Sequence, residues 1–274
     1  MECTHDYYIH NFKLYDSSNF DENILTDGIA VYEVIRIEKN IALFLEEHLS
    51  RLYYSSEIHS LQINEGYCDF ETLVEQLLEK NKISTGKIKI VVNFDKESRQ
   101  EKDILIYFTS HYFPSEDELK TGVNVGVHCG ERTKPNAKIL NTPIRTKTDY
   151  LIAENDIFEV LLLDSDGCIT EGSRSNVFFI KDNTIITSLE HDVLNGVTRT
   201  KLLKAFKQNN IELDQRKISL SEIEEMDCAF LTGTSIGILP IKNINGKNLN
   251  TNNNLLIKIK DLYNNLVNDY LEYN

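Results

Sequence analysis

Hydrophobic and polar positions divide the first part of the chain into short segments of two kinds. Apolar runs rich in β-branched residues predict strands at 29–37, 40–44, 87–94 and 103–110. Apolar residues at helical spacing predict helices at 45–61 and 71–80. In the first helix the apolar stripe consists of Leu45, Leu49, Leu52 and Ile58. Strands, then helices, then strands in this order favour an α+β domain.

The pattern changes at a polar stretch, residues 114–121, which we interpret as a linker. Beyond it, apolar runs predict strands at 123–127, 160–163, 177–180 and 229–231. Helices are expected at 149–157, from Gly196 onward and at 253–272. We therefore expect an α+β protein with a small N-terminal α/β domain, residues 1–116, and a larger C-terminal domain, residues 117–274.

Composition narrows the class of partner. The 274 residues are 41% hydrophobic, which is enough to bury a core, and the formal net charge is −14. That charge argues against nucleic acid or an anionic membrane, because both require clustered positive potential. The five cysteines are scattered, so neither a disulfide framework nor a zinc site is indicated. No apolar run approaches the roughly 20 residues of a membrane helix, and we expect a cytoplasmic protein.

Candidate chemistry begins with the segment Thr170-Glu171-Gly172-Ser173-Arg174-Ser175-Asn176, which lies between two apolar strands. A carboxylate followed by glycine and small hydroxyl residues suits a backbone that approaches another group closely. A plain polar hairpin explains the same residues, and on local chemistry alone it is favoured.

Two further segments have the residues of an anion site. Asn195-Gly196-Val197-Thr198-Arg199 lies at a helix start, where free N–H groups and the helix dipole favour an anion. Leu231-Thr232-Gly233-Thr234-Ser235 runs from a strand into a turn rich in glycine and hydroxyl groups. Ordinary helix capping and a simple turn are the alternatives.

His48 and Arg51 are three residues apart, so both lie on one face of the predicted helix. The forked guanidinium of an arginine suits a phosphate. The alternative for Arg51 is a surface ion pair with Glu47, and His48 is expected to orient its neighbours rather than to bind metal.

Taken together, these segments resemble a known family. The motifs Tyr32-Glu33-Val34-Ile35-Arg36, Glu47-His48-x-x-Arg51-Leu52, Thr170-Glu171-Gly172-Ser173-x-Ser175-Asn176, Gly196-Val197-Thr198-Arg199 and Thr232-Gly233-Thr234 look like those of the class IV aminotransferases. That family, the fold-type IV pyridoxal phosphate enzymes, includes branched-chain aminotransferases, D-amino acid aminotransferases and aminodeoxychorismate lyases. The motifs follow the family's order over residues 28–242. The resemblance implies a barrel-like larger domain and the cofactor pyridoxal 5′-phosphate.

The resemblance also implies a Schiff-base lysine upstream of Glu171, for which Lys138 and Lys147 are the candidates. Lys138 heads Lys138-Ile139-Leu140-Asn141, which is similar to the family's Lys-x-Leu-Asn, and it fits the family's spacing to Glu159 without a gap. We therefore favour Lys138, and we interpret Lys147 as a solvated lysine at a helix start.

By the same resemblance, Glu171 is expected to face the ring nitrogen of the cofactor. Arg51, the N–H groups of Val197 and Thr198, and Thr234 are expected to hold its phosphate. Tyr32 is expected to line the substrate side.

The substrate is where the sequence departs from the family. D-amino acid aminotransferases carry an Arg and a His after the strand at 87–94, and here that stretch reads Val91-Val92-Asn93-Phe94-Asp95-Lys96. Five cationic residues could bind the substrate carboxylate instead: Arg36, Lys96, Arg132, Arg145 and Arg174. We place Arg36 at the substrate site with Tyr32, and the sequence leaves open which of the five binds the carboxylate.

Three functions follow from the resemblance. The leading one is amino-group transfer between an amino acid and a 2-oxo acid. The second is a 4-amino-4-deoxychorismate lyase, because that enzyme class shares Lys-x-Leu-Asn and the spacing to the carboxylate. The third is a non-catalytic relative, which the presence of Lys138 and Glu171 opposes. The resemblance further implies a homodimer acting on small molecules.

Overall fold

The computed structural model describes residues 2–110 and 112–273, and its chain divides into two compact units. Unit 1 contains the residues up to Tyr112 together with Ala137–Asn141 and the segment from Asp269 onward. Unit 2 contains Phe113–Asn136 and Thr142–Asn268. Two segments that are distant in sequence therefore belong to the N-terminal unit.

Unit 1 is one antiparallel sheet covered by two helices. Its sheet has the strand order β2-β1-β6-β5-β3-β4. The strands are β1 (Tyr7–His10), β2 (Lys13–Asp16), β3 (Ile29–Glu38), β4 (Ile41–Ala42), β5 (Thr85–Phe94) and β6 (Glu101–Phe108). The helices are α1 (Leu45–Ile58) and α2 (Tyr67–Asn81). All the strands and helices expected before residue 111 are present, with ends shifted by a few residues.

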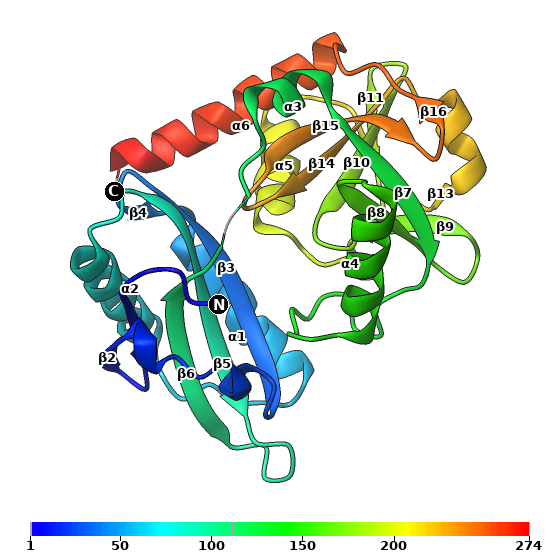
Figure 1. Ribbon diagram of the computed structural model, residues 1–274. Coiled ribbons are helices and arrows are strands. Elements are labelled where there is room, and N and C mark those ends of the chain that lie inside the picture. Colours follow the sequence, from blue (N-terminus) through cyan, green and yellow to red (C-terminus); the bar gives the residue numbers. More distant parts are fainter. Residues whose placement is uncertain (1, 111, 274) are drawn as a thin grey trace. The chain divides into compact units, whose positions relative to one another are not determined.

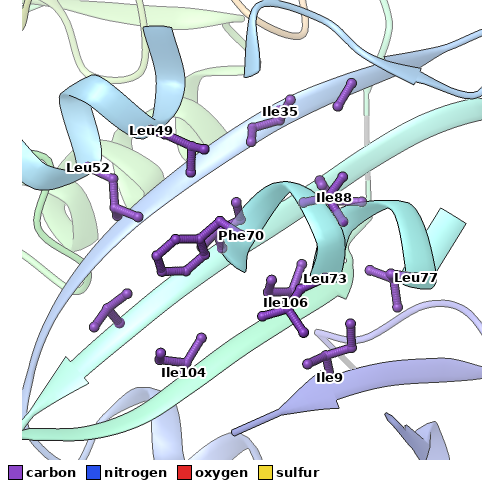
Figure 2. Close-up of a cluster of buried hydrophobic side chains, with 14 of the residues drawn as sticks. Ile9, Ile35, Leu49, Leu52, Phe70, Leu73, Leu77, Ile88, Ile104 and Ile106 are labelled. Carbon is purple, nitrogen blue, oxygen red and sulfur yellow. The ribbon is translucent and has the colours of Figure 1, made fainter. Parts of the chain in front are cut away.

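The core of unit 1 lies between this sheet and its two helices, as Figure 2 shows. Leu49 and Leu52 of α1 and Phe70 of α2 point toward the strands. Ile35 of β3 and Ile88 of β5 meet them from the sheet. Burial of such side chains contributes roughly 1.5–3 kcal/mol each, so this layer supplies most of what holds α1 in place.

Unit 2 contains a ten-stranded mixed sheet with the order β12-β11-β10-β14-β15-β7-β8-β9-β13, and β16 pairs with β15. The strands are β7 (Val123–Cys129), β8 (Glu159–Leu163), β9 (Cys168–Gly172), β10 (Asn176–Lys181), β11 (Thr184–Thr187), β12 (Leu213–Gln215), β13 (Ile218–Ser219), β14 (Cys228–Gly233), β15 (Gly237–Ile244) and β16 (Lys247–Asn248). Strand β7 runs parallel to both β15 and β8, whereas β14 is antiparallel to its neighbours. The sheet curls as a half-barrel (Figure 1), so the expected α+β class with a barrel-like larger sheet is confirmed.

The helices of this half of the chain are α3 (Glu116–Thr121), α4 (Pro143–Asn155), α5 (Val197–Gln208) and α6 (Asn254–Tyr273). Helix α5 packs on β14, and Phe206 of α5 meets Phe178 of β10 edge to face at 6.1 Å. The last five residues of α6 belong to unit 1, and the rest of the helix belongs to unit 2.

Helix α3 corrects the interpretation of residues 114–121 as a linker. Ser115 and Glu118 form a capping box, in which the Ser115 hydroxyl accepts from the Glu118 amide and the Glu118 carboxylate accepts from the Ser115 amide. These reciprocal bonds satisfy amides that a helix start otherwise leaves exposed. A polar, acidic stretch can therefore begin a helix as well as connect two domains.

Candidate active site

Lys138 belongs to a short extended segment that pairs with β3 in unit 1. The Tyr32 amide donates to the Lys138 carbonyl at 3.1 Å, and the Leu140 amide donates to the Ala30 carbonyl at 2.9 Å. On the other side, the Lys138 amide donates to the Ser55 hydroxyl of α1 at 3.0 Å. The backbone of the lysine is therefore fixed by both a strand and a helix.

The side chain of Lys138 lies against an aromatic ring. Its Nζ atom is 4.8 Å from the centre of the Tyr32 ring, a cation–π distance. Lys147, by contrast, is exposed on α4 in unit 2. Lys138 is therefore half-buried beside an aromatic ring, whereas the surroundings of Lys147 are open to solvent.

Arg51 and His48 converge on a carboxylate of β3. The Nε and Nη2 atoms of Arg51 donate to the two oxygens of Glu33 at 2.7 and 2.6 Å. His48 Nδ1 lies 2.7 Å from Glu33 Oε2. All three side chains are buried, so Arg51 pairs with a carboxylate inside the core, whereas the alternative from sequence was an ion pair at the surface. The view that His48 orients its neighbours fits this geometry.

In unit 2, Glu171 lies near the end of β9 and is only 3% exposed. Its Oε1 atom is 2.9 Å from Arg132 Nε. Its Oε2 atom accepts from the Leu194 amide at 3.0 Å and from the Asn176 side chain at 3.3 Å. Because a buried carboxylate is costly unless it is paired, the ion pair with Arg132 and the two hydrogen bonds account for its position.

The turn after Glu171 is built around a second buried carboxylate, Glu159 at the start of β8. Glu159 accepts from the hydroxyls of Ser173 and Ser175 at 2.6 and 2.8 Å. It also accepts from the backbone amides of Ser173 and Arg174, both at 3.1 Å. A Cβ on Gly172 would lie 2.3 Å from the Ser175 hydroxyl oxygen, so the glycine and the serines are needed for the turn to close on Glu159.

Helix α5 begins with backbone amides that have no side-chain cap, because its N-cap residue is Gly196. A Cβ at Gly196 would lie 2.2 Å from the Asn176 side-chain oxygen, so this position also needs glycine. Val197 and Thr198 follow in the first turn and are buried. An uncapped and buried helix start of this kind is suited to an anion.

The turn after β14 contains Thr234, which is partly exposed. Its neighbour Thr232 is 1% exposed, and the Thr232 hydroxyl has no hydrogen-bond partner among the described residues. A buried hydroxyl without a partner is uncommon in proteins, so this end of β14 is suited to receive a polar ligand.

The expected site residues fall into two groups. Unit 1 contains Tyr32, Arg36, Arg51 and Lys138. Unit 2 contains Glu171, Val197, Thr198 and Thr234. Within unit 1 the structure brings Lys138 to Tyr32. Within unit 2, the main chain at Leu194, two residues before Gly196, is hydrogen-bonded to Glu171.

Most of the cations proposed for a substrate carboxylate have acidic partners. Arg36 lies 2.8 Å from Glu38 on the same strand, and Arg132 is paired with Glu171. Arg145 and Arg174 both contact Asp149, at 3.0 and 2.6 Å. Lys96 is exposed after β5.

Asn93 lies near the end of β5, in the stretch that lacks the Arg and His expected of a D-amino acid aminotransferase. It is buried, and its amide donates to the carbonyls of Ile24 and Asp27 at 2.8 and 2.7 Å. Gly28 passes so close that a Cβ there would lie 2.1 Å from the Asn93 side-chain oxygen. Asn93 therefore secures the loop that leads into β3.

Glu33 and the pairing of Arg132 with Glu171 have no separate role among the expectations from sequence, where Glu159 serves only to mark a spacing. The signal for Glu33 was present, since it occupies an inward position of an alternating strand where an apolar residue is expected. No local pattern predicts that Arg132 pairs with Glu171, because 39 positions separate the two residues in the chain.

The part of the chain that the structure describes contains neither a membrane-spanning helix nor a metal-binding cluster of side chains. None of the helices in residues 2–110 and 112–273 is both long and apolar enough to cross a bilayer. No group of three or more His, Cys, Asp or Glu side chains that could bind a metal was found in the same residues.

Comparison with known proteins gives a consistent result. The sequence pattern of the family described as amino-transferase class IV matches residues 30–244. D-alanine aminotransferase of Bacillus licheniformis is 28% identical over 230 residues, which is 81% of each protein. A Thermotoga maritima protein named a probable branched-chain-amino-acid aminotransferase is 29% identical over 244 residues, 85% of each.

A solved structure agrees with these sequence relatives. The branched-chain aminotransferase of Thermoproteus uzoniensis is 23% identical and superimposes with a TM-score of 0.85 over 98% of both chains, which shows a common fold. Because the family pattern covers most of the chain and contains both Lys138 and Glu171, this protein belongs to the class IV aminotransferase family.

Proposed function

We propose that this protein is an aminotransferase that uses pyridoxal 5′-phosphate to move an amino group between an amino acid and a 2-oxo acid, through Lys138. The observation that carries the proposal is Glu171, a buried carboxylate held by Arg132, Leu194 and Asn176 in a strand that follows Lys138 at the family's spacing. Its sequence relatives that are named as aminotransferases support the same reaction class.

The residues of this chain fit the cofactor. The uncapped start of α5, with the amides of Val197 and Thr198, offers donors for a phosphate, and so do Arg51 and Thr234. The partnerless Thr232 hydroxyl beside Thr234 is consistent with a polar ligand there. Glu171 offers an acceptor for a protonated ring nitrogen. When bound, pyridoxal phosphate supplies an electron sink for the pair of electrons released at the substrate's α-carbon.

The remaining steps belong to side chains of the protein. The neutral amine of Lys138 would take the α-proton and return it to a different carbon, acting first as base and then as acid. The fixed backbone of Lys138 restricts where its amine can reach, which favours transfer along one face. Tyr32, against the same amine, would line the substrate side.

A lyase reaction is the second candidate. Lys138-Ile139-Leu140-Asn141 and the distance to Glu171 are shared with 4-amino-4-deoxychorismate lyases, which release pyruvate and 4-aminobenzoate. The same lysine would serve as the base. The choice between the two reactions depends on the substrate pocket, not on the cofactor residues.

The first test is spectroscopic. Protein supplied with pyridoxal phosphate should show the visible absorption of the lysine-bound cofactor, and Lys138→Ala should abolish it. Lys147→Ala, an exposed change, is the matched control and should keep the band. Loss of the band in Lys147→Ala with retention in Lys138→Ala would show that the wrong lysine has been chosen.

The second test separates transfer from elimination. Amino donors of both configurations are assayed with 2-oxoglutarate or pyruvate, beside an assay for pyruvate released from 4-amino-4-deoxychorismate. Product in the first assay alone supports the aminotransferase. Product in the second alone supports the lyase, and inertness in both with bound cofactor would reject both reactions.

Two further properties are proposed from the family resemblance alone. We expect a homodimer, which sedimentation velocity would show as a single species at twice the chain mass of 31.6 kDa. We also expect a cytoplasmic protein, which cell fractionation would test.

A further inference from the structure

A fully buried carboxylate lies between β3 and α1 in unit 1 and is given no role by the reaction described above. Glu33 is 0% exposed and His48 is 1% exposed. Glu33 receives two bonds from Arg51 and one from His48, all within 2.6–2.7 Å. Strand β3 supplies the carboxylate and helix α1 supplies both donors.

The geometry of the pair with Arg51 is two-pronged. Nε bonds to one carboxylate oxygen and Nη2 to the other, which is the fork-to-fork arrangement that fixes the plane of a guanidinium. Because a guanidinium is rigid and planar, these two bonds to Glu33 fix the direction of all of its N–H groups.

Charge in this cluster is balanced. Burial alone would raise the pKa of Glu33, but the charge of Arg51 and the hydrogen bonds from Arg51 and His48 outweigh it and lower that pKa to about 2. Burial lowers the pKa of His48, and Glu33 only partly opposes that effect. The cluster at neutral pH is a carboxylate, a guanidinium and a neutral imidazole whose Nδ1–H donates to Glu33.

We propose that Glu33 is a positioning residue for cofactor phosphate: it holds Arg51 in the orientation that binds the phosphate, with His48 fixing the second side of the carboxylate. The proposal rests on the proposed function, in which Arg51 contacts the phosphate of pyridoxal phosphate. It predicts a phosphate-specific effect, because Glu33 would act only through the arginine.

A competing view makes the opposite prediction. If Glu33 were only a negative charge close to the phosphate site, its removal would tighten phosphate binding by reducing repulsion. If Glu33 were only structural, its removal would weaken the binding of every ligand equally and lower the melting temperature. Comparing a phosphorylated ligand with its unphosphorylated form separates these views.

The experiment measures dissociation constants of pyridoxal 5′-phosphate and of pyridoxal for the full chain and for Glu33→Gln, Arg51→Gln and the double variant. We expect Glu33→Gln to raise the dissociation constant of pyridoxal phosphate by about tenfold or more, and that of pyridoxal by less than about twofold. The double variant should bind pyridoxal phosphate no more weakly than Arg51→Gln does, because the two residues would act as one unit. Asp103→Asn, which removes another carboxylate paired with a histidine in unit 1, is the matched control and should change neither constant.

Tighter or unchanged pyridoxal phosphate binding in Glu33→Gln, beside a loss in Arg51→Gln, would overturn the proposal. Equal weakening of both ligands would overturn it too. If Glu33→Gln does not fold, Glu33→Asp keeps the charge but cannot reach Arg51 with the same two bonds, and the same selective loss is expected. Failure of the unmodified protein to bind pyridoxal phosphate would instead reject the proposed function.

Discussion

Adjacent residues of β3 lie in different surroundings, because the side chains of a strand alternate between the two faces of a sheet. Tyr32 contacts the amine of Lys138, whereas Glu33 points into the layer of α1, among the apolar core residues Val31 and Ile35. A shift of one position would exchange the two and leave a carboxylate without its donors. The register of β3 on β5, which pairs Glu33 with Ile90, therefore matters for chemistry as well as for stability.

A second carboxylate with unusual acidity is Glu101, at the start of β6. Its Oε2 atom accepts from the Asn64 amide at 3.3 Å. Partial burial and a hydrogen bond with the Glu65 side chain raise the pKa of Glu101 to about 7. Two carboxyl groups that share a proton in this way favour the protonated form of one partner.

Stability should therefore depend on pH through Glu101. Its folded pKa is above its ordinary value of 4.5, so the folded state binds more protons between about pH 4.5 and 7. The unfolding free energy should fall as pH rises through that window and then level off. Glu101→Gln should remove this slope and be more stable than the unmodified protein at pH 8 by about 1 kcal/mol, a small value because the site is partly exposed.

Urea unfolding at pH 5 and pH 8 measures the effect. Glu97→Gln, in the exposed hairpin that precedes β6, is the control and should leave the slope intact. An unchanged slope in Glu101→Gln would show that the proton is not shared at this site.

At the scale of elements, helix α1 begins without a cap from its own chain neighbours. Its N-cap residue, Phe44, has a left-handed backbone and makes no side-chain cap. Tyr270 of α6, within unit 1, takes that place: its hydroxyl accepts from the Leu45 amide at 3.3 Å and donates to Glu46 at 2.9 Å. Its ring also packs on Phe44 at 4.9 Å.

Tyr270→Phe keeps the ring and removes the cap. We expect a loss of about 1 kcal/mol in the free energy of unfolding, the usual worth of a helix cap. Tyr273→Phe alters a highly exposed tyrosine three residues later and should have no effect. Chemical denaturation compares the two, and equal stabilities would mean that the hydroxyl at α1 contributes nothing.

At the scale of the whole molecule, unit 1 is completed by distant parts of the chain. Ala137–Asn141 covers the edge of β3 at residues 30–32, and the segment from Asp269 onward meets α1. An uncovered strand edge leaves backbone donors and acceptors without protein partners and promotes aggregation. The N-terminal unit therefore depends on residues that follow it in the sequence.

A fragment of residues 1–116, the N-terminal domain expected from sequence, tests this dependence. It lacks both completing segments, and we expect it to be substantially less stable than unit 1 in the full chain, or to aggregate. Circular dichroism and urea unfolding would show this. A cooperative transition at the midpoint of the full protein would instead mean that the two segments are dispensable for the fold of unit 1.

The sequence by itself determined the elements with strong periodicity and the motif residues of the family. The strand at 29–37, the helix at 45–61 and the C-terminal helix appear close to their expected ends, because apolar period and capping residues are local properties. Strand β15 was not predicted, and it contains Pro240, a residue that argues against a central strand when read locally. The resemblance supplied Lys138 and Glu171, whose roles stay predictions.

Only the tertiary structure decided which groups meet. The bonds of Glu33 to His48 and Arg51, of Glu159 to the turn at 173–175, and of Tyr270 to α1 join residues 14 to 225 positions apart. Local periodicity reports which face of an element is buried, but not what lies opposite that face. A buried charge is stable only with its partner, and the partner is chosen by the packing of the whole unit.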